Sequence, residues 1–319
     1  MKKNNMLKLF ILVMMSTGCA LQTSTSSNDL SSKKESSSLP IQLSSTTSTS
    51  SNNDSMQSST PLDTSYEEQS TIINSSIVES TSSEESSSVN EIVSNHYKGD
   101  YYNEIDFTLV DSAMKTELRE LVTKTHTTVI KYNSLNNILY KTDRSLSDSS
   151  KVTLFYSHKD VNGTWDQGNT YNKEHVWPQS TGWSKETTAG ADVHHLRPAD
   201  PTVNSTRGNL PFGEVNGGKE AKLKNGEGSN CYYANGYFEP QDAVKGDVAR
   251  IIFYLLTRYS DADNKSITGV AKSMDMLLEW NELDPVDELE MQRNKEGQSQ
   301  QGNRNPFIDY PELADFIWG

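Results

Sequence analysis

The feature that most limits what this chain can fold into is a long tract rich in serine and threonine near its start. Residues 20–90 hold 35 Ser or Thr among 71 residues, together with nine acidic side chains and two lysines. A segment this poor in apolar side chains does not bury enough surface to offset the entropy lost on folding. The sequence therefore predicts a disordered, acidic tether over residues 20–95 and confines the folded domain to residues 96–319.

The first 19 residues have the pattern of an export signal. Three lysines precede a short apolar run at residues 9–15, and small residues follow the run. Positive charge, a short apolar core and small residues at the exit are typical of a secretory signal peptide. We therefore expect residues 1–19 to direct export of the chain.

The end of this segment, Ser16-Thr17-Gly18-Cys19, resembles the lipobox of bacterial lipoproteins. In a lipobox the cysteine becomes the lipidated first residue of the mature chain. The resemblance implies lipidation of Cys19 and a position on the extracellular face of a cell membrane, with a Gram-positive source favoured. Ser16 departs from the leucine usual at that place, so ordinary secretion after cleavage and an uncleaved anchor stay open as alternatives.

The charge of the remaining chain excludes two classes of protein. Residues 91–319 carry a net charge of −10, and no part of them is strongly basic, which excludes a protein that coats nucleic acid. No apolar run reaches the roughly 18 residues that a membrane span needs, which excludes a polytopic membrane protein. Cys231 has no partner if Cys19 carries lipid, and we interpret it as a small, partly buried apolar residue.

Apolar periodicity in the folded part indicates the α+β class, with a few strands set among helices. A buried strand is expected where an apolar run is short, and a helix where apolar residues recur at three- and four-residue steps. The expected elements are a helix from residue 111 to residue 129, strands over 152–157 and 171–177, a short helix within 198–208, and helices over 241–259, 270–279 and 311–318.

Residues 171–209 combine side chains that suit phosphodiester hydrolysis. A neutral histidine such as His175 takes a proton from water near pH 7. Mg²⁺ prefers oxygen ligands and keeps several waters, so one carboxylate and one amide from the protein suffice, and Glu174 and Asn204 supply them. Neighbours on a strand point to opposite faces. Glu174 and His175 therefore serve one site only where the strand twists or ends, which Pro178 favours.

The alternative is a zinc site. His175, His194 and His195 lie within 21 positions of one another, and histidine is a common zinc ligand. Adjacent histidines tend to diverge, which argues against this set. The roles of His194 and His195 therefore stay open between orienting the site and supporting the fold.

Four segments together closely resemble the bacterial endonuclease I family, in the order of that family and over nearly all of residues 96–319. The version here is most similar to the secreted nucleases of Gram-positive bacteria. The segments are residues 171–180 (YNKEHVWPQS), 191–213 (ADVHHLRPADPTVNSTRGNLPFG), 238–259 (FEPQDAVKGDVARIIFYLLTRY) and 301–318 (QGNRNPFIDYPELADFIW).

The resemblance implies a ββα-metal (His-Me finger) endonuclease core surrounded by helices. It implies that His175 is the general base and that Glu174 and Asn204 ligate one divalent cation, usually Mg²⁺, with Mn²⁺ or Ca²⁺ as alternatives. Its substrates would be DNA, RNA or both, cut without sequence preference to leave 5′-phosphates. No obligate protein partner is evident, and contact with a membrane is expected only through the lipid anchor.

The basic residues of the site are less well defined by the resemblance. Arg197 and Arg207 are assigned as catalytic residues that bind phosphate, and Arg250 as a further phosphate contact. Between the first two motifs, where some members carry a catalytic basic residue, this chain has only Lys185. Gly190 stands where some members carry a carboxylate. Which group stabilises the transition state stays open.

A second class of function is a surface lipoprotein that has lost catalysis and binds nucleic acid or a host partner. The intact Glu174, His175 and Asn204 argue against this alternative. The negative charge of the domain does not exclude a nuclease, because only a few phosphates need to be contacted.

Overall fold

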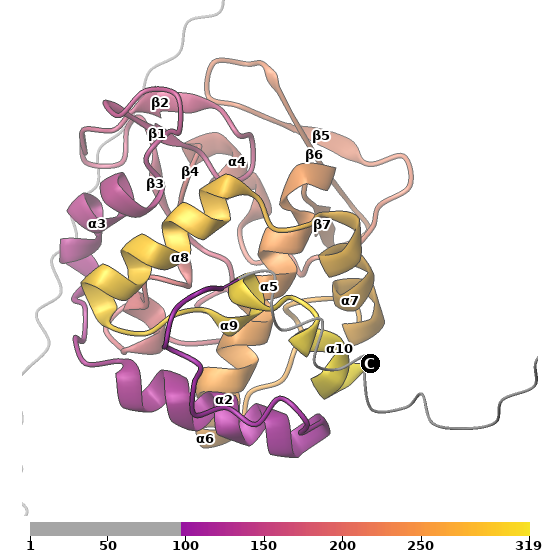
Figure 1. The fold of residues 1–319 in the computed structure, drawn as a ribbon. Helices are drawn as coiled ribbons and strands as arrows, with labels where there is room; N and C mark the ends of the chain where they lie inside the picture. Colours follow the sequence, from indigo (N-terminus) through magenta and orange to yellow (C-terminus); the bar gives the residue numbers. More distant parts are fainter. Residues whose placement is uncertain (1–96) are drawn as a thin grey trace, which may run out of the picture. The chain divides into compact units, whose positions relative to one another are not determined.

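The structure is a computed structural model that describes residues 97–319 (Figure 1). The expected export signal, the expected lipidation site Cys19 and the whole of the expected tether lie outside the described residues. Within residues 97–319 none of the helices combines the length and apolar character needed to cross a bilayer.

The centre of the domain is helix α5 (Lys245–Leu255), all of whose residues are buried. Its apolar side chains point in every direction, as expected for a helix enclosed by other elements. Figure 1 shows α5 in the middle of the fold, with the strands gathered at the end opposite α2. The helical elements packed on α5 are η4 (Leu256–Ser260), α7 (Met274–Leu283) and α9 (Pro306–Asp309).

The strands of the described region form three small antiparallel sheets. Together with the helices they confirm the α+β class. In the sheet that carries the candidate site, Glu174 lies opposite Arg197 and His175 lies opposite Leu196. The sheets pair β1 (Lys151–Thr153) with β2 (Asp160–Asn162), β3 (Asn172–His175) with β4 (Leu196–Ala199), and β5 (Lys219–Lys222) with β6 (Gly228–Ala234), which also pairs with β7 (Tyr237–Glu239).

The remaining helices cover this arrangement. Two of them, α3 and α8, pack against each other. The buried face of α8 is largely polar, since it includes Glu290, Arg293 and Asn294. The remaining helical elements are α2 (Asp111–Thr125), η1 (Tyr132–Ser134), α3 (Leu135–Thr142), η2 (Ala189–Ala191), α4 (Pro201–Arg207), η3 (Asp242–Val244), α6 (Asp261–Asp263), α8 (Glu288–Gln301) and α10 (Leu313–Trp318).

Several predicted elements are confirmed, and three need correction. Helix α2 ends at Thr125, so Val129 lies beyond it and is 64% exposed. The run 152–157 is buried as expected, but only its start is a strand, because the chain turns there and the His158 N–H donates to the Leu154 carbonyl. The helix expected at 270–279 begins four residues later, where Ser273 caps it. Cys231 is fully buried and forms no disulfide within the described residues.

Candidate active site

A cavity of about 270 Å³ opens where strand β3 ends. Glu174 and His175 both line it, although they are neighbours in the chain. Strand β3 ends at His175, so the alternation of sides is lost at this point, as the position of Pro178 indicated. The lining residues are Lys173, Glu174, His175, Pro178, Gln179, Ser180, Asn204, Gly208 and Asn209.

Helix α4 brings Asn204 to the same cavity. Strand β4 runs directly into this helix through Asp200, whose carboxylate accepts the N–H groups of Thr202 at 2.8 Å and Val203 at 3.2 Å. An aspartate cap followed by proline at the first helical position fixes where a helix starts. The chain therefore forms strand, strand and helix in succession, and the helix packs beside β3.

Glu174 is a buried carboxylate, with 2% of its surface exposed. Its Oε1 accepts the Tyr156 hydroxyl at 2.7 Å and lies 3.1 Å from Nη1 of Arg207. Burial raises the pKa of Glu174, while Arg207 and the Tyr156 hydrogen bond act in the opposite direction. A cation in the cavity would also favour the ionised form of this carboxylate.

Asn204 uses its side-chain nitrogen within the protein. Nδ2 donates to Oδ1 of Asn172 at 2.6 Å. This assignment of the amide leaves its carbonyl oxygen Oδ1 for a further contact. The cavity thus offers one carboxylate and one amide oxygen, which are both ligand types that hard divalent cations prefer.

His175 is oriented by a backbone carbonyl. Its Nε2 lies 3.0 Å from the oxygen of Gly190, and because a carbonyl only accepts, Nε2 carries the proton. The lone pair is therefore on Nδ1. Burial lowers the pKa of His175 to about 3, and the neighbouring His195 contributes to the shift. The imidazole is neutral at physiological pH, as a base that takes a proton from water must be.

His194 and His195 bind backbone groups. His195 accepts the N–H of Trp177 at Nε2 (3.0 Å), and its Nδ1 lies 2.8 Å from the carbonyl of Ala189. Nε2 of His194 lies 2.9 Å from the carbonyl of Asn303. The three histidines do not converge on one point. No group of three or more His, Cys, Asp or Glu side chains in the part of the chain that is described has a metal-binding arrangement.

Arg207 lies beneath the cavity and is 1% exposed. In addition to Glu174, its guanidinium donates to the carbonyls of His175 (3.0 Å) and Val176 (2.6 Å). These contacts hold the end of β3 from inside the protein. In the structure the Arg207 donors reach the Glu174 carboxylate and the backbone of the site, and contact with phosphate stays a prediction from the resemblance.

Arg197 and Arg250 are equally buried, and neither lines the cavity. Arg197 donates to Asp143 and Asp247, each at 2.8 Å, and Arg250 forms an ion pair with Glu290. The structure thus places both guanidinium groups on carboxylates inside the protein, and their contact with phosphate stays a prediction. A sequence shows that these positions are basic, but not that carboxylates distant in the chain enclose them.

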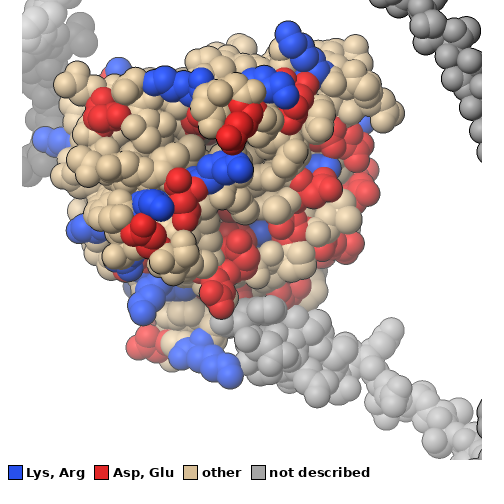
Figure 2. Space-filling view, turned by 90° about the horizontal axis from the view of Figure 1, so that it is seen from above, with Lys and Arg blue, Asp and Glu red and all other residues tan. Residues whose placement is uncertain are grey.

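In addition to the buried Arg207, two lysines lie near the cavity. Lys173, which lines it, places Nζ 4.2 Å from the centre of the Tyr132 ring, and Nζ of Lys185 lies 5.6 Å from the same ring. Sequence reasoning missed Lys173 and Tyr132; the signal for Lys173 was its place directly before Glu174. Figure 2 shows basic and acidic side chains interspersed on one face of the molecule, without a continuous basic surface.

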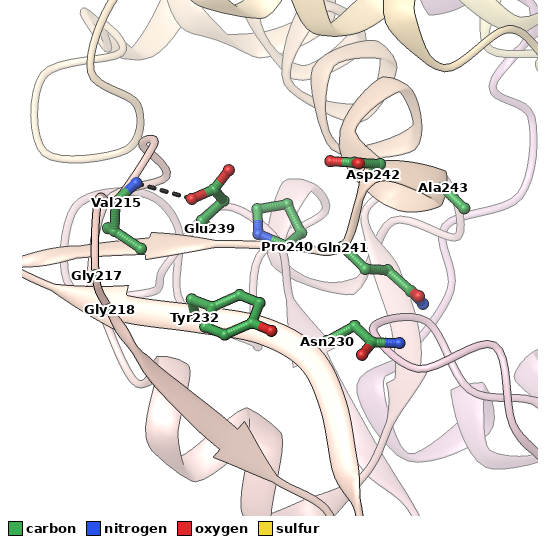
Figure 3. Close-up of a pocket in the computed structure, with 10 residues that line it drawn as sticks. All are labelled: Val215, Gly217, Gly218, Asn230, Tyr232, Glu239, Pro240, Gln241, Asp242 and Ala243. Carbon is green, nitrogen blue, oxygen red and sulfur yellow. Dashed lines mark hydrogen bonds between the residues drawn. The ribbon is translucent and has the colours of Figure 1, made fainter. Parts of the chain in front are cut away.

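A larger cavity, of about 630 Å³, lies beside β6 and β7 (Figure 3). It contains none of the residues described above. Its carboxylates are already paired: Glu239 accepts the N–H of Val215 and an ion pair from Lys245, and Asp242 binds the same lysine. Its two carboxylates share one lysine and no histidine among the described residues lines it, whereas Glu174, His175 and Asn204 meet in the smaller cavity, which is therefore the candidate active site.

Comparison with known proteins shows which class of protein this chain belongs to. The Endonuclease I family model matches residues 111–312. The protein is a nuclease, an enzyme that hydrolyses the phosphodiester bonds of nucleic acids. The chain belongs to the endonuclease I family.

Similar bacterial proteins are also named as nucleases. An extracellular ribonuclease of Bacillus subtilis (strain 168) is 40% identical over 233 residues, which cover 68% of this chain and 78% of that protein. An extracellular ribonuclease of Bacillus amyloliquefaciens is 40% identical over 222 residues, or 65% of this chain and 74% of that one. An extracellular deoxyribonuclease of Aeromonas hydrophila is 29% identical over 123 residues, which are 37% and 48% of the two chains.

Proposed function

We propose that this protein is an exported, metal-dependent endonuclease that cuts DNA, RNA or both without sequence preference. The observation that carries the proposal is the meeting of Glu174, His175 and Asn204 in one cavity at the end of β3. In this proposal β3, β4 and α4 are the ββα-metal (His-Me finger) core. The related proteins named extracellular ribonuclease and extracellular deoxyribonuclease support both the breadth of substrate and the export.

Glu174 and Asn204 would hold one divalent cation. The residues fit such an ion, since they are a carboxylate and an amide oxygen at the same cavity, and an ion such as Mg²⁺ keeps several of its waters. A bound Mg²⁺, or Mn²⁺ or Ca²⁺ in its place, neutralises the charge of the phosphate and of the leaving oxygen. Cysteine and paired histidine ligands, which zinc favours, are not part of the proposed site.

His175 acts as the general base in this proposal. Nδ1 removes a proton from the attacking water, while Nε2–H keeps its hydrogen bond to Gly190. The water oxygen bonds to phosphorus as the bond from phosphorus to the 3′ oxygen breaks. The 3′ oxygen takes up a proton from solvent and becomes a hydroxyl, and the other fragment keeps a 5′-phosphate.

Arg207 is proposed as a positioning residue. By holding the carbonyls of His175 and Val176 together with the carboxylate of Glu174, it fixes the base and the ligand relative to each other. We assign Arg197 and Arg250 to the support of the fold.

The attachment of the protein to the cell is proposed from the sequence. Lipidation of Cys19 would anchor the chain to the outer face of the cell membrane, and residues 20–95 would hold the nuclease away from it. The names of the Bacillus relatives support the extracellular location.

The direct test is digestion of supercoiled plasmid and of total RNA by the full chain, with Mg²⁺ and with EDTA. We expect cleavage of at least one substrate with Mg²⁺, loss of cleavage with EDTA, and product ends that accept label from a kinase only after phosphatase treatment. Undiminished cleavage in EDTA would contradict the metal-dependent reaction. No cleavage of either substrate by the folded protein would favour a binding lipoprotein.

A further inference from the structure

A second cavity, of about 540 Å³, adjoins the proposed active site. It is formed by residues 129–133 and residues 185–188. Tyr132 separates the two cavities: it lines the second one, and its ring stacks on that of His175, with centroids 5.7 Å apart and planes 14° apart. Only the Tyr132 ring therefore separates a group in the second cavity from His175, the proposed base.

The lining of this second cavity combines an aromatic ring with apolar side chains. Tyr132 lies beside Ile130 and Val129, and Val129 is 64% exposed. The amide of Asn133, the hydroxyl of Thr188 and the carboxylate of Glu186 line the same cavity, and Glu186 lies 4.0 Å from the ammonium of Lys185. A flat surface for stacking, with hydrogen-bonding groups around it, is the chemistry that holds an unstacked nucleobase.

Two lysines mark the border between the cavities. Lys173 lines the proposed active site and Lys185 lines the second cavity, yet both ammonium groups lie over the Tyr132 ring. Two like charges held over one ring repel each other. An anion between them would relieve that repulsion, and the anion that accompanies every base in a nucleic acid is its phosphate.

We propose that the second cavity is a nucleobase subsite, in which Tyr132 and Val129 receive the base next to the scissile phosphate while Lys173 and Lys185 bind phosphate. This inference rests on the proposed function and specifies its substrate class. A base inside a duplex is paired and stacked, and it must leave the helix before it enters a pocket. The preferred substrate is therefore single-stranded nucleic acid.

The subsite is tested with two single-stranded substrates of equal length and charge. One is an ordinary oligonucleotide, and the other is a chain of abasic phosphodiester units. With Mg²⁺, the full chain should show a higher kcat/KM on the oligonucleotide, by about 10-fold, which corresponds to one stacked base.

The decisive comparison is between two variants that add the same charge at positions of the same exposure. Val129→Asp changes the subsite, and Leu283→Asp changes an equally exposed residue, also 64%, at the end of α7. Val129→Asp should abolish the preference for the base-containing substrate, whereas Leu283→Asp should retain it. An unchanged preference in a folded Val129→Asp protein would overturn the subsite.

A second measurement tests the substrate class. The unmodified protein should cleave a single-stranded oligonucleotide at least about 10-fold more efficiently than the same sequence in a duplex. Equal or faster cleavage of the duplex would overturn the inference and leave the proposed nuclease reaction intact. Failure to cleave any of these substrates would instead refute the proposed function.

Discussion

At the scale of single residues, Gly190 combines two roles in the candidate site. Its carbonyl accepts from His175 and so selects the tautomer of the proposed base. Its lack of a side chain is also required, because a Cβ at this position would lie 1.9 Å from the backbone oxygen of Ser184. To relieve this contact, the backbone at Ser184 or at Gly190 would have to move, and the Gly190 carbonyl would move with it.

Gly190→Ala should therefore impair catalysis through His175. We expect kcat to fall about 100-fold, the effect of displacing a catalytic group by about 1 Å. Steady-state kinetics of the full chain with Mg²⁺ measures this. Gly228→Ala is the matched control, since its new methyl would meet only the side chain of Glu220. A Gly190→Ala enzyme with the kcat of the control would contradict the role of the carbonyl.

The sequence predicted the residue types of the site better than their roles. Glu174, His175 and Asn204 were selected because their chemistry suits a metal-assisted hydrolysis, and the fold brings them to one cavity. Arg197 and Arg207 were selected for their charge, but each binds acceptors inside the protein. Whether an arginine binds phosphate or an acceptor inside the protein depends on the distant elements that surround it. The residues next to the arginine in the chain do not show those elements.

At the scale of elements, a buried ionic network ties the sheet of the site to three helices. Asp143 follows helix α3 and binds Arg197 of β4 and Arg293 of α8. Arg197 continues the network to Asp247 of α5. Removing one member of a buried set leaves the opposite charge without compensation, which costs more than the pair itself contributes.

Asp143→Ala should therefore lower the free energy of unfolding by about 3–5 kcal/mol, as measured by urea denaturation. The matched control is Asp261→Ala. Asp261 also binds two cations, Lys115 and Arg119, but its side chain is 46% exposed, so the expected loss is below about 1 kcal/mol. If the two variants lost the same free energy of unfolding, the buried ion pairs of Asp143 would contribute no more to stability than the exposed ion pairs of Asp261. Asp143→Asn, which keeps an acceptor, provides a milder variant if Asp143→Ala does not fold.

Most elements with an apolar face were predicted, although α3, which buries Leu135, Ile138 and Leu139, was missed. Elements with a polar buried face were not predicted. Helix α5 and its continuation carry apolar residues at helical spacing, and the expected helix is there. Helix α8 was missed because its buried face includes Glu290, Arg293, Asn294 and Gln301, which give no hydrophobic period. The sheet of β5, β6 and β7 was missed as well. Burial alternates along β6, but Ser229 occupies a buried position and Tyr232 an exposed one, so the residue types do not show the alternation.

At the scale of the whole molecule, buried histidines couple folding to pH. Burial lowers the pKa of His194 to about 4, whereas an unfolded histidine titrates near 6.5. Between these values the unfolded chain binds a proton that the folded chain does not bind. The stability contributed by neutral His194 is thus present above about pH 6.5 and is lost as the pH falls toward 4.

His194→Gln removes this titration. Between pH 6.5 and 4.5 the free energy of unfolding of the variant should fall less steeply than that of the unmodified protein, by up to about 1.4 kcal/mol per pH unit. Urea denaturation at a series of pH values measures the two slopes. Parallel slopes would mean that His194 keeps its ordinary pKa in the folded protein.

The proposed function depends above all on His175 as the base of a nuclease reaction in the cavity shared with Glu174 and Asn204. The most direct measurement compares the full chain with its His175→Ala variant, with Mg²⁺, for both cleavage and binding of one single-stranded oligonucleotide. We expect cleavage to fall at least about 100-fold, while Kd changes only a few-fold. Cleavage by the variant at the rate of the unmodified protein would contradict the claim.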